Sequence, residues 1–218
     1  SFQVMDQAEL EDTIRQAFFI ANDGRPGPVL IDIPKDVQMN TVVKQSPLSL
    51  PKRPEFMTNS SQFEQARDLI SQSKKPMFYI GGGVDIAGGT DKLRELLNLT
   101  QIPAVTTLKG IGAVPKSYPH GMGMLGMHGG AGANLAVQEA DLLIALGARF
   151  DDRVTGKLAS FAPNARVLHI DVDNSEINKL RQVELAINCD LSTALPLLLN
   201  ELTGFGDLAT EKWQPWRE

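Results

Sequence analysis

The sequence predicts an α/β protein with a Rossmann-like, doubly wound parallel sheet covered by helices on both faces. Three observations predict this class: short apolar segments alternate with amphipathic ones, glycines and charges follow several apolar segments directly, and 42% of the 218 residues are hydrophobic. Strands that are apolar on both faces require a sheet covered on both sides. A chain of this length is expected to form one such domain with a smaller piece beside it.

The N-terminal part is predicted to form a helix followed by a strand. Within residues 6–22 the apolar positions recur at helical spacing, and Gly24 follows as a stop. The apolar run 29–33 is expected to be a buried strand. A proline-rich segment without periodicity, 41–55, is interpreted as a linker, so a domain boundary is expected there.

The alternation of helices and strands repeats after the linker. Asn59, Ser60 or Ser61 can cap a helix whose apolar face carries Phe63 and Ile70. The further expected elements are strands over 77–80, 104–108, 142–147, 167–172 and 186–189, and helices over 92–99, 131–139, 175–181 and a last one to Leu202.

Composition excludes several classes of function. The chain carries 21 Lys and Arg against 26 Asp and Glu, a net charge of −5, and no basic run that would follow a phosphate backbone, so nucleic acid is not expected as a partner. No apolar stretch approaches the roughly 20 residues that span a bilayer, and no secretion signal is recognisable. The single Cys189 is expected to be a small buried residue. We expect a soluble cytoplasmic protein without a membrane partner.

Candidate ligand-binding residues lie where the expected strands end, because parallel sheets bind ligands beyond the carboxyl ends of their strands. The first strand ends in Gly81-Gly82-Gly83, and glycines there allow a backbone to approach a pyrophosphate closely. The second ends in hydroxyl and small residues, 106–112. An ordinary turn would explain either segment equally well.

A methionine-rich segment, 121–130, is less ordinary. Its methionines lack the periodicity of a core helix, and their soft side chains could line a flat aromatic ligand. His128 in this segment is interpreted as a loop residue, because His120 and His169 show no metal-ligand spacing with it. We therefore expect no histidine metal site.

Charged residues gather after the next two strands. The segment 147–153 contains Arg149 and Arg153, whose planar guanidinium groups can bind phosphate or carboxylate, although a solvated, salt-bridged loop is the alternative. Asp171 ends the following strand and could accept ribose hydroxyls or cap the helix expected near Ser175. Together the strand ends suggest a bound dinucleotide. Hydrophobic periodicity cannot decide which dinucleotide it is.

Three motifs carry a resemblance to a known family. The segment GRPGPVLIDIPKDV, 24–37, resembles the end of the pyrimidine-binding domain of thiamine-diphosphate enzymes. The segments MLGMHG, 124–129, and GARFDDRVTGK, 147–157, resemble the acetohydroxyacid synthase (acetolactate synthase) large-subunit family. The resemblance implies that residues 1–40 are the tail of a pyrimidine-binding domain and 56–205 a central FAD-binding domain. Residues 206–218 would then begin a linker to a third domain outside this chain.

The resemblance also implies an activity. Members of the family decarboxylate pyruvate and join the two-carbon unit to pyruvate or 2-ketobutyrate, in branched-chain amino acid biosynthesis. They use thiamine diphosphate and Mg²⁺, bind FAD without net redox change, form homo-oligomers and associate with a regulatory small subunit.

The resemblance transfers a set of residues to this sequence. The residues expected around FAD are Arg25, Gly81, Gly82, Thr107, Leu108, Met124, Leu125, Gly126, Met127, His128, Gly147, Ala148, Arg149, Asp151, Arg153, Val154, Asp171, Val172 and Asp190. The residues expected near the mouth of the substrate channel are Lys35, Met127, Asp152 and Arg153, with Arg153 suited to hold a ketoacid carboxylate.

The sequence departs from the family in one respect. It contains no Gly-Asp-Gly motif, since Gly206-Asp207 is followed by Leu208, and no complete thiamine site. We therefore assign no catalytic or metal-binding residue and expect this piece alone to bind FAD without catalysing carboligation. The alternatives are a stand-alone NAD- or FAD-binding module or a non-catalytic interaction protein. One cysteine argues against a sirtuin-like module with a four-cysteine zinc site.

Overall fold

The computed structural model describes residues 1–42, 49, 59–204 and 211–218. The chain divides into two compact units, Ser1–Glu55 and Phe56–Glu218. Most of the linker expected over 41–55 lies outside the described residues. In the part of the chain that is described, no helix combines the length and the apolar character needed to cross a membrane.

The described residues of the first unit form a two-stranded parallel sheet and three helical segments. Strand β1 (Phe2–Gln3) pairs with β2 (Ile31–Asp32), and η1 (Gln7–Glu9) and α1 (Leu10–Asn22) connect them. The helix expected over 6–22 is thus confirmed, its first turn being a 3-10 helix capped by Asp6. Neither β1 nor α2 (Lys35–Met39) was predicted, because such short segments show no periodicity.

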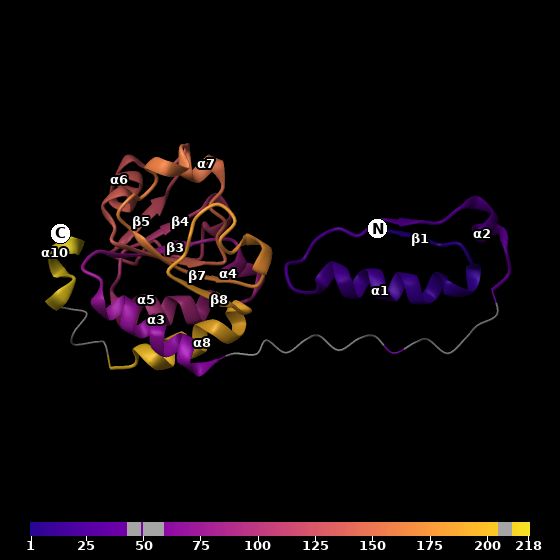
Figure 1. Ribbon diagram of the computed structural model, residues 1–218, viewed down its shortest axis with the longest axis horizontal. Helices are drawn as coiled ribbons and strands as arrows, with labels where there is room; N and C mark the ends of the chain where they lie inside the picture. Colours follow the sequence, from indigo (N-terminus) through magenta and orange to yellow (C-terminus); the bar gives the residue numbers. More distant parts are fainter. Residues whose placement is uncertain (43–48, 50–58, 205–210) are drawn as a thin grey trace. The chain divides into compact units, whose positions relative to one another are not determined.

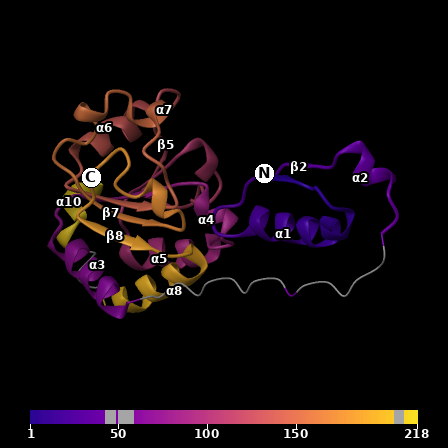
Figure 2. The same ribbon diagram turned by 45° about the vertical axis from the view of Figure 1, so that its right-hand side comes forward.

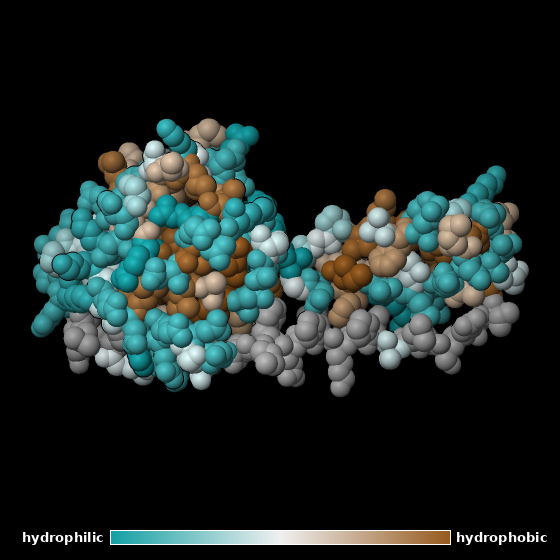
Figure 3. Space-filling view, in the orientation of Figure 1, coloured by the Kyte–Doolittle hydropathy of each residue, from teal (hydrophilic) through white to brown (hydrophobic). Residues whose placement is uncertain are grey.

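The strand expected over 29–33 is present as β2, but it is shorter than predicted and is not buried within this unit. Only Ile31 and Asp32 pair, and the side chain of Leu30 is 69% exposed. One helix beside two short strands cannot cover both faces of the sheet, so apolar side chains on the other face stay uncovered within this unit. Figure 3 shows hydrophobic residues on its surface, and Met5, Phe18 and Met39 are among those exposed.

The second unit is built on a six-stranded sheet, parallel throughout (Figure 1). Its spatial order is β5 (Gly121–Met124), β4 (Ala104–Thr106), β3 (Pro76–Ile80), β6 (Leu142–Leu146), β7 (Arg166–Asp171) and β8 (Leu185–Asn188). Every residue of β3 and β6 is buried, as expected for central strands that are covered on both faces. The predicted fold class is confirmed.

Helices cover both faces of this sheet, and Figures 1 and 2 show the two layers from different sides. Helices α3 (Ser60–Gln72), α5 (Thr90–Thr100) and α8 (Leu191–Leu202) cover one face, and α6 (Ala131–Glu139) lies on the other. Two hydrophobic clusters fill the spaces between the layers. The first contains Phe63 and Leu195, and the second contains Tyr79 and Phe150.

Capping residues set several boundaries. Of the three candidate caps for α3, Asn59 is the one observed, because its Oδ1 accepts the amide of Ser61 at 3.0 Å. Helix α5 ends where Gln101 adopts a left-handed φ of 52°. The remaining short elements are α4 (Gly83–Ile86), η2 (Leu108–Gly110), α7 (Asp152–Thr155), η3 (Leu158–Ser160), η4 (Asn174–Glu176) and α10 (Gln214–Arg217).

The helix expected over 175–181 is absent from the described structure, which has only η4 there. Asn178 takes a left-handed φ of 59°, which interrupts a helix. The guanidinium of Arg181 donates to the carbonyls of Phe161, Ala162 and Ala165, and these bonds hold the segment in an irregular path. Tertiary hydrogen bonds therefore override the weak local helical pattern.

Two strands differ from prediction on the other side of the sheet. The strand expected over 104–108 ends at Thr106, because the hydroxyl of Thr107 accepts the amide of Gly110 and begins η2. The segment 121–124, for which no strand was predicted, is the edge strand β5. Its glycines hide the usual strand pattern, and pairing with β4 decides the conformation.

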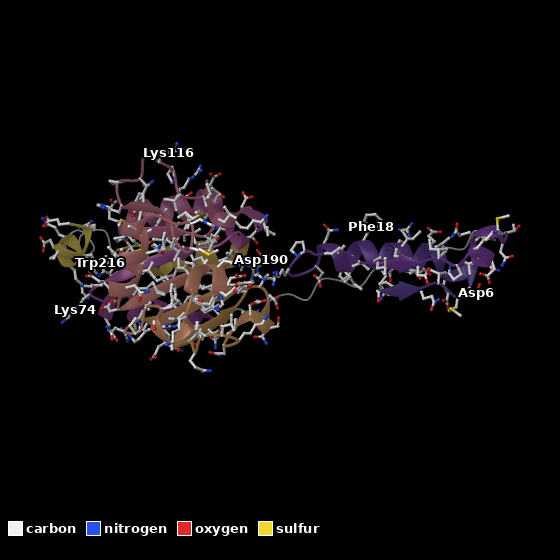
Figure 4. All side chains as sticks on the ribbon, turned by 90° about the horizontal axis from the view of Figure 1, so that it is seen from above. Asp6, Phe18, Lys74, Lys116, Asp190 and Trp216 are labelled. Carbon is white, nitrogen blue, oxygen red and sulfur yellow. The ribbon has the colours of Figure 1, made fainter. Side chains whose placement is uncertain are left out.

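The C-terminal residues pack against the beginning of β3 and the residues before it. Trp213 is 1% exposed and its Nε1 donates to the carbonyl of Ser73 at 3.0 Å. Trp216 donates in the same way to the carbonyl of Pro76 at 2.8 Å. Figure 4 shows Trp216 and Asp190 on opposite sides of this unit. The two tryptophans therefore anchor the C-terminal segment at the amino edge of the sheet, away from the carboxyl ends of the strands.

Candidate functional site

The order of the strands creates a switch point between β3 and β6. The chain proceeds from β3 to β4 and β5 on one side, and from β6 to β7 and β8 on the other. Connections therefore leave the carboxyl ends of β3 and β6 in opposite directions and open a crevice there, which is the usual ligand position in such sheets. The residues that follow these strands are Gly81-Gly82-Gly83 and Gly147-Ala148-Arg149.

The glycines at the switch point pack backbone against backbone. A Cβ on Gly83 would lie 2.7 Å from the Cα of Gly147, and one on Gly110 would lie 2.4 Å from the carbonyl oxygen of Ile80. Real Cβ atoms do not approach that closely. The sequence interpretation explained these glycines by access for a ligand, whereas the structure shows that close packing of neighbouring segments also requires them.

Backbone donors remain available at this point. Among the described residues, the amides of Gly82, Ala148 and Arg149 donate to no protein acceptor. Ala148 is only 2% exposed, so its amide lies in a partly desolvated position where an unmade hydrogen bond is costly. Backbone amides that have no protein acceptor and have glycine neighbours suit an anionic group such as a pyrophosphate.

The methionine-rich turn and the arginine loop meet beside this crevice. The amide of Met127 donates to the carbonyl of Arg153 at 2.9 Å. Gly126 has a φ of +97°, and a Cβ there would lie 2.7 Å from the same carbonyl oxygen. Two motifs separated in the sequence, 124–130 and 147–157, are thus brought into contact.

Asn134 on α6 holds the turn in place. Its Oδ1 accepts the amide of Gly126 at 2.8 Å, and its Nδ2 donates to the carbonyl of Gly126 at 3.0 Å. Sequence reasoning did not identify this residue. An asparagine inside a helix is intrinsically unfavourable, so its position within the predicted helix 131–139 could have indicated a specific role for its side chain.

The arginine loop is supported from below by a buried tyrosine. The hydroxyl of Tyr79 donates to the carbonyl of Arg149 at 2.7 Å, and its ring lies 5.4 Å from that of Phe150. Burial raises the pKa of Tyr79 above its usual range, so the hydroxyl stays protonated and can donate. The role of Tyr79 at this site was not predicted, because aromatic residues in buried strands are usual in a hydrophobic core.

The charges of the loop partly neutralise one another. Arg149 forms an ion pair with Asp151 at 3.1 Å, with about half of the arginine side chain exposed. The amide of Arg153 lowers the pKa of Asp151 below its usual value, so Asp151 remains charged. Arg153 is 76% exposed in its side chain and lies 4.0 Å from Asp152, so its guanidinium remains accessible to an anionic ligand.

Carboxylates occupy the ends of β7 and β8. Oδ1 of Asp171 accepts the amide of Asp173, whereas Asp173 itself caps η4, so Asp171 is not the cap considered for a helix near Ser175. Asn188, another residue that sequence reasoning missed, donates to the carbonyls of Asp171 and Val172. Asp190 caps α8 by accepting the amide of Ser192 at 2.8 Å.

The remaining predicted residues differ in accessibility. Leu125 is buried in the core, so only its backbone can reach a ligand. Thr107, Met124 and Val154 are partly buried, and Leu108, Met127 and His128 are exposed. Arg25 and Lys35 belong to the first unit, where both are exposed and Lys35 is the first residue of α2. In the described residues, no group of three His, Cys, Asp or Glu side chains could hold a metal ion.

Comparison with known families identifies the fold. Residues 63–198 match the family described as "Thiamine pyrophosphate enzyme, central domain". The chain belongs to the thiamine pyrophosphate enzymes. The match covers β3 to β8 and therefore the whole carboxyl edge of this thiamine pyrophosphate enzyme domain.

Individual relatives show which thiamine pyrophosphate enzymes this chain resembles. It is 50% identical to the acetolactate synthase isozyme 2 large subunit of Escherichia coli, over 94% of the chain and 37% of that protein. It is 45% identical to the acetolactate synthase large subunit of Corynebacterium glutamicum, over 99% of the chain and 35% of the relative. It is 43% identical to acetolactate synthase 2, chloroplastic, of Nicotiana tabacum, over 100% of the chain and 33% of that protein.

The comparisons confirm the resemblance to acetolactate synthase large subunits that the motifs predicted. The chain spans about a third of the length of these relatives.

Proposed function

We propose that the protein to which this chain belongs is an acetolactate synthase large subunit. It would decarboxylate pyruvate and condense the two-carbon unit with pyruvate or 2-ketobutyrate. The identity of 43–50% to relatives named as acetolactate synthases supports this proposal. Thiamine diphosphate and Mg²⁺ would be held outside this chain, whose 218 residues contain no Gly-Asp-Gly motif.

For the chain itself we propose FAD binding at the carboxyl edge of the sheet. The observation that carries this is the switch point between β3 and β6, where the amides of Gly82, Ala148 and Arg149 have no protein acceptor among the described residues. These donors suit the pyrophosphate, and Arg149 adds a positive charge. Asp171 and Asp190 would contact the adenosine part, and Met124, Met127 and Val154 the isoalloxazine ring.

The exposed residues at the rim suit a second, smaller ligand. Arg153 would bind the carboxylate of the incoming ketoacid, and Met127 and Asp152 would lie near the mouth of the substrate channel. A guanidinium is suited to this role because its planar donors match both carboxylate oxygens. The side chain of Arg153 is 76% exposed, so a carboxylate ligand can reach its guanidinium group.

The proposal extends to partners and location. A regulatory small subunit is expected because the Escherichia coli relative is named as a large subunit, and assembly into a homo-oligomer is part of the same proposal. We propose a cytoplasmic location on the basis of the bacterial relatives, while the tobacco relatives are named as chloroplastic.

Flavin titration of the chain tests the site. Binding of FAD is measured by quenching of flavin fluorescence for the unchanged chain and for Arg149→Ala. Loss of a charge-assisted contact to phosphate is expected to weaken binding by at least about tenfold, since such bonds contribute about 1.5–3 kcal/mol. The matched control is Arg67→Ala on α3, whose guanidinium pairs with Asp68 and Glu201 and lies outside the candidate site.

The possible outcomes separate the alternatives. Equal affinity in Arg149→Ala and Arg67→Ala would overturn the assignment of Arg149. A chain that binds NAD more tightly than FAD would favour a stand-alone dinucleotide module. A chain that takes up neither would overturn the proposed cofactor site.

A further inference from the structure

His169 is a buried polar residue in the middle of β7. It is 0% exposed, and among the described residues neither Nδ1 nor Nε2 has a hydrogen-bond partner. Its ring meets that of Phe150 edge to face, with centroids 5.5 Å apart. Its strand neighbours Leu168 and Ile170 are both fully buried apolar residues.

Packing alone does not account for a histidine at this position. An apolar ring could make the same edge-to-face contact with Phe150 without removing two polar nitrogens from water. Unsatisfied buried polar groups are costly and uncommon in folded proteins, so one that is retained calls for a specific role.

The carboxylate of Asp171 lies close to the imidazole of His169. Two residues apart on one strand, His169 and Asp171 lie on the same face of the sheet. Nε2 of His169 lies 3.7 Å from Oδ2 of Asp171, about 0.5 Å beyond the upper limit of a normal N–H···O hydrogen bond. Oδ1 of Asp171 already accepts the amide of Asp173 at 2.9 Å, and the carboxylate is 9% exposed.

The carboxylate can accept more hydrogen bonds than it receives here. An ionised carboxyl group has about four acceptor positions, and Oδ2 has none filled at hydrogen-bond distance by the described residues. Both members of the pair thus have unmade hydrogen bonds, and a small shift of the Asp171 side chain would bring Oδ2 to the imidazole.

We propose that His169 is a positioning residue for Asp171, and that it fixes this carboxylate for a ribose hydroxyl of the bound dinucleotide. After this shift, Nε2–H of His169 donates to Oδ2, the amide of Asp173 holds Oδ1, and the hydroxyl donates to the outward-facing lone pairs. The inference rests on the proposed cofactor site, because Asp171 is its adenosine contact. His169 itself is fully buried and does not touch the ligand.

A double-mutant cycle on the chain tests this role. FAD affinity is measured by fluorescence quenching for the unchanged chain, His169→Phe, Asp171→Asn and the double variant. His169→Phe is expected to bind FAD about tenfold more weakly, which corresponds to about 1.4 kcal/mol. On the Asp171→Asn background the same substitution is expected to have almost no further effect, because the imidazole acts through that carboxylate.

Thermal unfolding without ligand gives an independent readout. Because His169→Phe removes two unsatisfied nitrogens and keeps an aromatic ring, its melting temperature is expected to equal or exceed that of the unchanged chain. A residue with a merely structural role would lower it. His169→Gln supplies an amide donor and is expected to recover part of the affinity, and His169→Leu replaces His169→Phe in the cycle if the larger ring prevents folding.

The outcomes distinguish this inference from the proposed site. If Asp171→Asn weakens FAD binding while the apolar variants of His169 do not, His169 has no positioning role. A loss that adds fully to that of Asp171→Asn, or a lower melting temperature, would also overturn the inference. If the unchanged chain binds no FAD, or Asp171→Asn binds it normally, the proposed site fails at that point and this role fails with it.

Discussion

A Cβ atom on Gly81 would lie 1.9 Å from the carbonyl oxygen of Gly147. The segments after β3 and β6 thus meet through their backbones, and Gly147 itself has a left-handed φ of 55°. This contact fixes the distance between the two segments whose amides line the crevice. A side chain at either position would separate them.

We predict that Gly81→Ala destabilises the second unit by about 3 kcal/mol, the upper end of the usual cost of overpacking, because the clash is with backbone atoms that cannot move independently. Chemical denaturation followed by circular dichroism measures the change. The matched control is Gly132→Ala in α6, where the nearest atom is 3.9 Å from the new Cβ. That substitution is expected to stabilise the helix by about 0.5–1 kcal/mol, and equal effects of both variants would contradict the packing account.

Trp213→Ala is expected to lower stability by about 3–5 kcal/mol, because it empties a fully buried indole site in the core. Trp213→Phe retains much of the volume but leaves the carbonyl of Ser73 without its donor, so a loss of about 1–3 kcal/mol is expected. Thermal unfolding ranks the variants. The exposed Leu135→Ala on α6 serves as the control, with little change expected.

Asn134→Ala is expected to loosen the turn that contains Met127. The amide of Gly126 loses its acceptor, which costs about 1–3 kcal/mol when the group stays buried, whereas the carbonyl of Gly126 keeps the amide of Gly129 as a donor at 2.9 Å. Hydrogen exchange at the amide of Gly126 should accelerate by more than about tenfold. Unchanged exchange at Gly126 would show that another contact holds this turn.

The stability of the second unit is expected to depend on the ionisation of His120. Burial and the positive charge of Arg217 lower the pKa of His120 below its usual value, and its ring lies edge to face with Tyr118. The folded state therefore binds a proton less readily than the unfolded state. Stability is fully present above about pH 6.5, the usual pKa of histidine, and part of it is lost as the pH falls through the lowered pKa.

Melting temperatures at about pH 7.5 and about pH 5 measure this effect. Carboxylates also titrate over this range. The test is therefore the difference in acid sensitivity between the unchanged chain and His120→Phe. The variant should lose less stability on acidification than the unchanged chain. An equal loss in both proteins would exclude the proposed contribution of His120.

Much of the second unit follows from local patterns. The apolar runs at β3 and β6, and the cap before α3, identify elements whose boundaries the structure confirms within one or two residues. The helix expected over 175–181 was wrong because Arg181 forms tertiary hydrogen bonds that no local pattern shows. The glycine-rich β5 lacks a strand pattern for a different reason: its conformation is decided by pairing with β4.

The candidate site divides in the same way. Its glycines and arginines could be predicted, because the carboxyl ends of parallel strands lie on one edge and these residues follow the strands directly. Asn134 and Tyr79 could not, because each holds the site through a hydrogen bond to a residue in another segment, and the unpartnered nitrogens of buried His169 are visible only in the structure.

The sequence by itself determined the class of fold, the alternation of elements and the segments at the carboxyl edge, since these depend on hydrophobic periodicity and turn residues. Only the tertiary structure decided which segments touch: Gly81 against Gly147, the turn at Met127 against Arg153, and Trp213 in the core. The physical reason is that periodicity reports which face of an element avoids water, whereas contacts depend on how elements from distant parts of the chain pack together.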